Sequence, residues 1–148
     1  MPLTQTLEYQ SVVTSSWLNE VKDKAEYTCI VIPLPAFTGG STVRSAIVGM
    51  ATTHPIVITH VAVACDTVPS GTGMSVMLRK KPNGQSAVDV LSSAIDPTTL
   101  TALTPSEGSV NSSNASVAAN DAIYVELSAT TVSTNWTGGC MTIWARHA

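Results

Sequence analysis

The sequence predicts an all-β fold, a jelly-roll-like antiparallel sandwich of about eight strands that follows a short N-terminal arm and helix. Past residue 27 the chain consists of short runs of Val, Ile, Thr, Ser and Ala. Gly, Pro and Asn residues separate these runs about every 8–12 residues, as between the strands of a sandwich. Charged residues make up only 11% of the chain, against roughly 25% in typical domains. We therefore expect an attachment segment over residues 1–27 and one β body over residues 28–148.

The attachment segment begins with a polar, mixed stretch over residues 1–13, which we interpret as an extended arm. Residues 14–27 are amphipathic, because Trp17, Val21 and Ala25 recur at helical spacing and Leu18 lies beside them. This spacing predicts a helix of about three turns, too short to be stable alone in water. Its apolar stripe must therefore pack on the β body of its own chain, on a neighbouring subunit or on a larger assembly. Trp17, Leu18 and Val21 are candidate partner-binding residues.

The β body begins with an apolar run over residues 28–32 that ends at Pro33. The longest β-branched run, residues 55–65, is apolar on both faces and is expected at the centre of a sheet. In residues 122–128, Ile123, Val125 and Leu127 fall on one face of a strand. The other predicted strands cover residues 42–50, 74–80, 86–91, 98–103 and 140–146, while residues 107–119 form either a loop or a polar edge strand.

Metal-binding residues are few and badly spaced. His54 and His60 fall on the same side of a predicted strand, with Asp66 in the same register. Six residues at about 3.3 Å each separate the two imidazoles by about 20 Å, too far to share one ion. Only a bent strand or help from His147 could bring a metal site together. The sequence therefore predicts no metal site.

Catalytic motifs are equally scarce. No Gly-x-Ser-x-Gly sequence marks a nucleophile elbow, and the acidic residues form no close pair of the kind that glycosidases use. The glycines at 71, 73, 138 and 139 are not followed by the Lys or helix of a phosphate-binding loop. We predict a protein that is not an enzyme and that has no cofactor.

Charge and targeting signals reduce the number of partner classes that the sequence leaves open. The net charge is -3, and the only cluster among seven Lys and Arg is residues 79–81, too few to bind a nucleic acid. No apolar run reaches the roughly 20 residues of a membrane span. Residues 1–5 carry no secretory signal, and the odd number of cysteines, Cys29, Cys65 and Cys140, favours reduced, buried thiols. We expect synthesis in a cytoplasm and neither nucleic-acid nor membrane binding.

The surface chemistry leaves two questions open. A surface solvated by Ser and Thr hydroxyls is less protected against association than a charged one, which favours contact with copies of the chain or with an assembly. The alternative is a Thr-rich β protein with no such role. Trp136, in a predicted loop, is a fourth candidate partner-binding residue. It is either a platform for stacking a sugar or a residue that packs on its own sheet or in an interface.

Two parts of the chain resemble virion proteins of tailed bacteriophages. Residues 13–21 resemble N-terminal attachment segments, and the body, through residues 56–65, 69–78, 120–127 and 139–144, resembles the jelly-roll modules of capsid decoration (cement) proteins and fibre tips. The resemblance implies a non-enzymatic homotrimer, made in the host cytoplasm, that joins the virion by binding the major capsid protein. One alternative is a fibre-tip module that contacts a host glycan through Trp136 and residues 111–116. The other is an enzyme on the same scaffold, for which the sequence offers no site.

Overall fold

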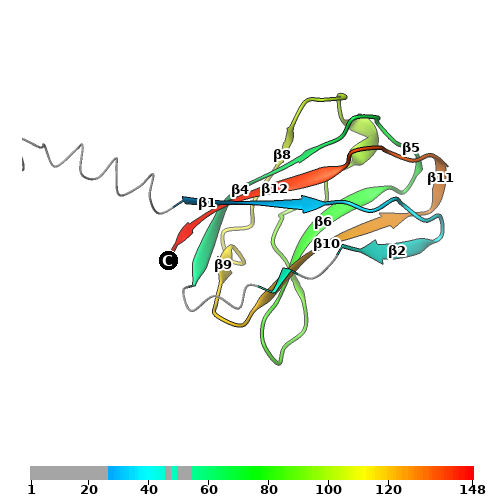
Figure 1. The fold of residues 1–148 in the computed structure, drawn as a ribbon. Helices are drawn as coiled ribbons and strands as arrows, with labels where there is room; N and C mark the ends of the chain where they lie inside the picture. Colours follow the sequence, from blue (N-terminus) through cyan, green and yellow to red (C-terminus); the bar gives the residue numbers. More distant parts are fainter. Residues whose placement is uncertain (1–26, 46–47, 50–54) are drawn as a thin grey trace, which may run out of the picture.

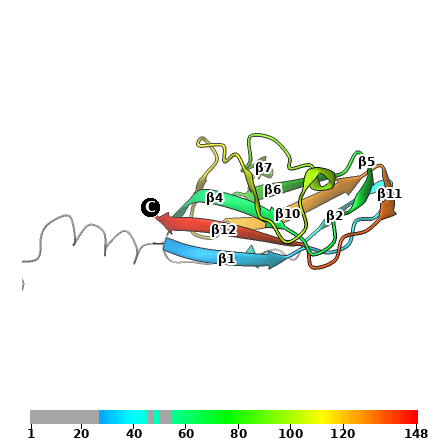
Figure 2. The same cartoon turned by 90° about the horizontal axis from the view of Figure 1, so that it is seen from above.

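The computed structural model describes residues 27–45, 48–49 and 55–148. The predicted arm and the predicted helix up to residue 26 lie outside these residues, and so do Trp17, Leu18, Val21 and His54. Tyr27, expected at the end of that helix, instead begins the first strand of the β body. The described chain forms two antiparallel sheets that pack face to face, with the C-terminus beside the start of β1 (Figures 1 and 2). The prediction of an all-β sandwich is confirmed.

The strand order is that of a jelly roll. The first sheet has the order β1-β12-β4-β8 with β9 also on β4, and the second has the order β2-β10-β6-β7 with β3 also on β10. The chain crosses repeatedly from one sheet to the other, so the first and last strands become neighbours. The bounds are β1 Tyr27–Pro33, β2 Ser41–Arg44, β3 Val48–Gly49, β4 Ile56–Ala64, β6 Ser75–Lys81, β7 Val88–Asp89, β8 Ser106–Gly108, β9 Ser116–Val117, β10 Ala122–Ala129 and β12 Cys140–His147.

The core lies between the two sheets and is made by alternate residues of each strand. Ile123, Val125 and Leu127 of β10 are fully buried, as their shared face predicted. They meet the inward rows of the first sheet, to which Val61 of β4 and Ile143 of β12 belong. Each such side chain contributes about 1.5–3 kcal/mol when it is removed from water. This apolar layer makes the β body a rigid support for the side chains on its outer faces.

β4 is central in its sheet, as its apolar run predicted, because it pairs with β12 on one side and with β8 and β9 on the other. The β4–β12 register shifts between Trp144 and Ala145, so Thr59 is an extra residue in β4. The Thr59 hydroxyl donates a hydrogen bond of 3.1 Å to the Trp144 carbonyl. This bulge keeps Ile58 and Val61 buried and places His60 opposite Trp144 on the outer face.

The strand predicted over residues 98–103 is wrong. Pro97–Thr99 is instead a 3₁₀ turn, capped by Asp96, whose Oδ1 accepts hydrogen bonds from the Thr98 backbone N–H at 2.9 Å and the Thr98 hydroxyl at 2.7 Å. Leu103 then takes a φ of 58°, which no strand contains. Asp and Thr side chains that form hydrogen bonds with nearby backbone groups compete with strand pairing. Here the local hydrogen bonds are formed and the predicted strand is not.

Three other predicted boundaries change. The run 42–50 divides into β2 and β3, and between them the buried Ser45 hydroxyl accepts a hydrogen bond of 2.8 Å from the Val125 N–H. The run 86–91 keeps only Val88–Asp89 as a strand, whereas 107–119 contributes β8 and β9 with a loop between them. A separate two-stranded ribbon, β5 Ser70–Thr72 with β11 Thr131–Thr134, lies at the end opposite to the C-terminus and was not predicted (Figure 1).

Candidate functional site

Trp136, in the connection between β11 and β12, is 5% exposed. Its Nε1 donates a hydrogen bond of 2.8 Å to the Pro35 carbonyl, and its ring lies 4.8 Å from the Phe37 ring, centroid to centroid. A Cβ on Gly139 would lie 2.7 Å from the indole, so only glycine admits the ring there. The indole is therefore held between two segments of its own chain. This position favours the packing alternative over the sugar-stacking one.

The polar residues in and beside the predicted glycan-binding surface also form hydrogen bonds within the chain. The Asn135 side chain accepts from the Phe37 N–H at 2.8 Å and donates to the Phe37 carbonyl at 2.9 Å. The Asn114 amide donates to the Asp89 carbonyl at 2.8 Å, and the Asn111 side chain accepts from the Ser113 N–H at 3.1 Å. These groups hold loops in place, and no feature of them favours glycan recognition.

Titratable residues do not converge on a reaction centre in the described part of the chain. There, no three His, Cys, Asp or Glu side chains lie close enough together to hold a metal ion. His60 points outward from β4, and the Asp66 carboxylate accepts a hydrogen bond of 3.3 Å from the Thr137 hydroxyl. The residues proposed from the sequence as metal ligands are thus not brought together among those that the structure describes.

A row of charges crosses the outer face of the second sheet. Arg44 contacts Glu126 at 3.1 Å, Glu126 contacts Arg79 at 3.5 Å, and Arg79 contacts Asp89 at 2.7 Å. The hydrogen bond that Arg79 donates to the Asp89 carboxylate raises the pKa of Arg79 above its ordinary value. The Arg44 and Asp89 side chains are exposed and the Glu126 and Arg79 side chains are half-buried, so each pair contributes about 1 kcal/mol or a little more. The row balances its own charge, so it offers no strongly charged surface to a partner.

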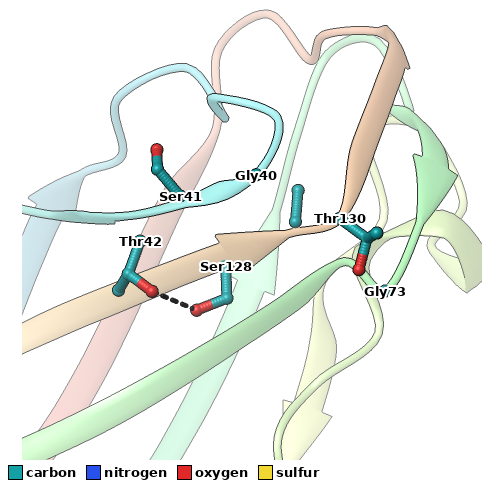
Figure 3. Close-up of a pocket in the computed structure, with 7 residues that line it drawn as sticks. Gly40, Ser41, Thr42, Gly73, Ser128 and Thr130 are labelled. Carbon is teal, nitrogen blue, oxygen red and sulfur yellow. Dashed lines mark hydrogen bonds between the residues drawn. The ribbon is translucent and has the colours of Figure 1, made fainter.

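The depressions on the surface are open. Figure 3 shows one of about 320 Å³, in which the Thr42 and Ser128 hydroxyls lie 3.0 Å apart and the Thr130 side chain points toward Gly73. Its lining is Gly40, Ser41, Thr42, Gly73, Ser128, Ala129 and Thr130. Hydroxyls and backbone without a titratable group suit a contact surface and supply no acid, base or nucleophile of perturbed pKa.

The outer face of the first sheet is different, because apolar side chains gather at its margin. Val31 is 59% exposed, Trp144 is 36% exposed, and Cys29, the register partner of Trp144, is exposed as well. We call these three residues the β1 rim. β1 is the outermost strand of its sheet (Figure 2), and its seven residues carry no charge. Neighbouring exposed apolar side chains on an uncharged edge strand are typical of an interaction surface.

The exposure of Cys29 corrects the expectation that all three thiols are buried. Ile30 and Ile32 face the core, so strand alternation turns Cys29 outward. Cys65 is buried, and Cys140 is half-buried. Burial raises the pKa of the Cys65 thiol, and the nearby Asp66 and Cys140 raise it further.

This difference predicts an order of thiol reactivity. Because the thiolate is the reactive form, Cys29 is expected to react with iodoacetamide at pH 8 at least about tenfold faster than Cys65 in the native protein. Timed alkylation with mass spectrometry of the peptides measures both rates. In urea the two rates should converge, which serves as the control. Equal rates in the native protein would contradict the burial of Cys65.

Among the described residues, no helix has both the length and the apolar character needed to cross a lipid bilayer. Comparison with known proteins finds no matching family model, no matching curated protein and no matching solved structure. The candidate functional site of the described chain is the β1 rim.

Proposed function

We propose that this protein is a non-enzymatic virion structural protein that decorates a phage capsid as a trimer and stabilises it by binding the major capsid protein. The observation that carries the proposal is the β1 rim, an apolar and uncharged margin on a jelly-roll body. The predicted amphipathic helix directly precedes β1 in the chain. Apolar docking groups therefore follow one another along the sequence from Trp17 to Val31.

The stabilisation follows from mass action. A protein that binds only the assembled shell lowers the free energy of that shell at every occupied site, by about 2.7 kcal/mol when its free concentration is 100 times its Kd. A trimer multiplies a weak contact, because the second and third contacts form at a high effective concentration. Such a role requires a rigid body and a surface that binds the capsid, and it requires no catalytic residue.

The test is to mix the purified protein with undecorated capsids of the phage that encodes it. We expect the protein to sediment with the capsids and to raise the temperature at which they break. Replacing Trp17, Leu18 and Val21 together by alanine should weaken binding by about tenfold or more, since truncating one buried interface aromatic costs about 2 kcal/mol. The matched control, Glu20→Ala with Lys24→Ala, alters the polar side of the same segment and should bind normally.

Two results bear on the proposal in different ways. Failure of the full-length protein to sediment with capsids would overturn the decoration function. Normal binding by the triple alanine variant would instead move the capsid contact from the predicted helix to the β body.

A further inference from the structure

β1 has one open edge. It pairs with β12 along its whole length, from Tyr27 opposite Arg146 to Pro33 opposite Cys140. Within the ranges that the structure describes, no strand pairs with its other edge. The other strands at the margins of the two large sheets have two to four residues, so β1, with seven, is the long edge of the body. Unpaired N–H and C=O groups along such an edge are a template for another strand.

The side chains of β1 determine what kind of strand fits there. Its inward row includes Ile30, which packs against the core but stays half-buried, and its outward row includes Cys29 and Val31. Native edge strands are usually protected by charged residues or prolines, and β1 has only Pro33, at its end. A strand added here needs apolar side chains toward Ile30 and polar side chains on the solvent side.

Residues 4–13 have this pattern. Leu7, Tyr9 and Val13 fall on one side of an extended chain, together with Gln5 and Ser11. Thr4, Thr6, Glu8 and Gln10 fall on the other side, where Val12 is the one apolar residue. A period of two is that of a half-buried strand. We propose that residues 4–13 of one copy of this chain add as a strand to the open edge of β1 in a second copy. Its apolar row covers Ile30, and its polar row lies beside Cys29 and Val31.

The donor is a second copy because of the segment between the arm and β1. Residues 14–26, as the predicted helix, would hold Val13 and Tyr27 about 20 Å apart, at about 1.5 Å per residue. Paired strands lie only about 4.8 Å apart, so the arm could not form a tight antiparallel hairpin with its own β1 while that helix is intact. If each chain donates its arm to the next chain around a three-fold axis, every β1 edge is paired and the assembly closes as a trimer. The inference is independent of capsid binding, since purified protein suffices to test it.

Disulfide crosslinking to the native Cys29 tests the inference in the full-length chain. Cysteine is introduced one position at a time, as Thr6→Cys, Leu7→Cys, Glu8→Cys, Tyr9→Cys and Gln10→Cys, and the proteins are oxidised and separated on a non-reducing gel. We expect crosslinks between chains at positions 6, 8 or 10, at least about fivefold above those at 7 and 9, because alternate residues of a strand face opposite sides. In a Cys29→Ser background these crosslinks should disappear.

The other outcomes overturn the inference. Crosslinks confined to single chains would show that the arm returns to its own β1. Equal yields at odd and even positions, or none, would show that no strand forms there.

A second measurement uses the oligomeric mass. Leu7→Pro with Glu8→Pro removes two backbone donors from the arm and should convert the oligomer to monomers in light scattering, whereas Leu7→Thr with Glu8→Thr keeps both donors and should retain it. An unchanged mass for the proline variant would also overturn the inference. Loss of capsid binding with retained crosslinks would affect only the proposed function.

Discussion

Replacing Trp136 by alanine is expected to lower the free energy of unfolding by about 3–5 kcal/mol, the range for truncating a buried aromatic side chain. The indole is 5% exposed and lies between Phe37 and Gly139, so its removal leaves a cavity that the glycine cannot fill. The Pro35 carbonyl also loses its 2.8 Å partner. These contacts join the β1–β2 and β11–β12 connections, so the loss should reduce the stability of the whole body.

Urea denaturation followed by tryptophan fluorescence and circular dichroism measures this effect. Trp144→Ala deletes the same side chain from a position that is 36% exposed and should cost about 1 kcal/mol or less. Trp136→Phe keeps an aromatic ring but loses the hydrogen bond, so it should fall between the two. A Trp136→Ala protein as stable as Trp144→Ala would contradict the buried position and return Trp136 to the candidate partner surface.

Replacing Asp121 by alanine is expected to cost about 2–4 kcal/mol, because hydrogen bonds to a charged group contribute about 1.5–3 kcal/mol each. The carboxylate is 7% exposed and accepts one bond of 3.0 Å from the Asn83 N–H and another of 3.0 Å from the Ala118 N–H. It therefore ties the loop after β6 to the turn before β10. Without it, both donors lose their acceptor.

The matched control is Asp89→Ala. Its carboxylate makes a shorter contact, 2.7 Å to Arg79, but its side chain is 45% exposed, so water replaces the lost partner and the cost should stay near 0–1 kcal/mol, as for other surface pairs. Thermal melts of both variants give the comparison. If Asp89→Ala destabilised the protein more than Asp121→Ala, exposure would not be the deciding factor and the account of Asp121 would be wrong.

The two tryptophans also illustrate how far the sequence predicted the candidate site. Trp144 lies in a predicted strand, but its neighbours depend on pairing: the regular β1–β12 register places it opposite Cys29, and the Thr59 bulge in β4 places it opposite His60. Trp136 lies in a predicted loop, where the sequence left both packing and ligand contact open. The alternation of Ile30 and Ile32 around Val31 was the signal that could have identified the β1 rim, since a strand facing the core at both isoleucines must expose the valine between them.

The fold was predictable where alternation or long β-branched runs dominated. Residues 55–65 became the central strand β4, because a β-branched run that is apolar on both faces is favoured within a sheet rather than at its margin. Residues 122–128 became β10, because apolar side chains at a period of two pack between two sheets. Prediction failed at residues 98–103, where the Asp96 side chain bonded to local backbone. It also missed the β5–β11 ribbon, whose short Ser- and Thr-rich strands have no apolar period.

The sequence by itself determined that this protein is a charge-poor β body, because composition, strand period and turn residues are local properties of the chain. Only the tertiary structure decided which strand was left at the edge of a sheet. Strand pairing joins residues more than a hundred positions apart, as Tyr27 with Arg146, and the partner of each strand depends on how both sheets close over one core. Among the residues that the structure describes, the unpaired edge of β1 and its apolar rim follow from that closure.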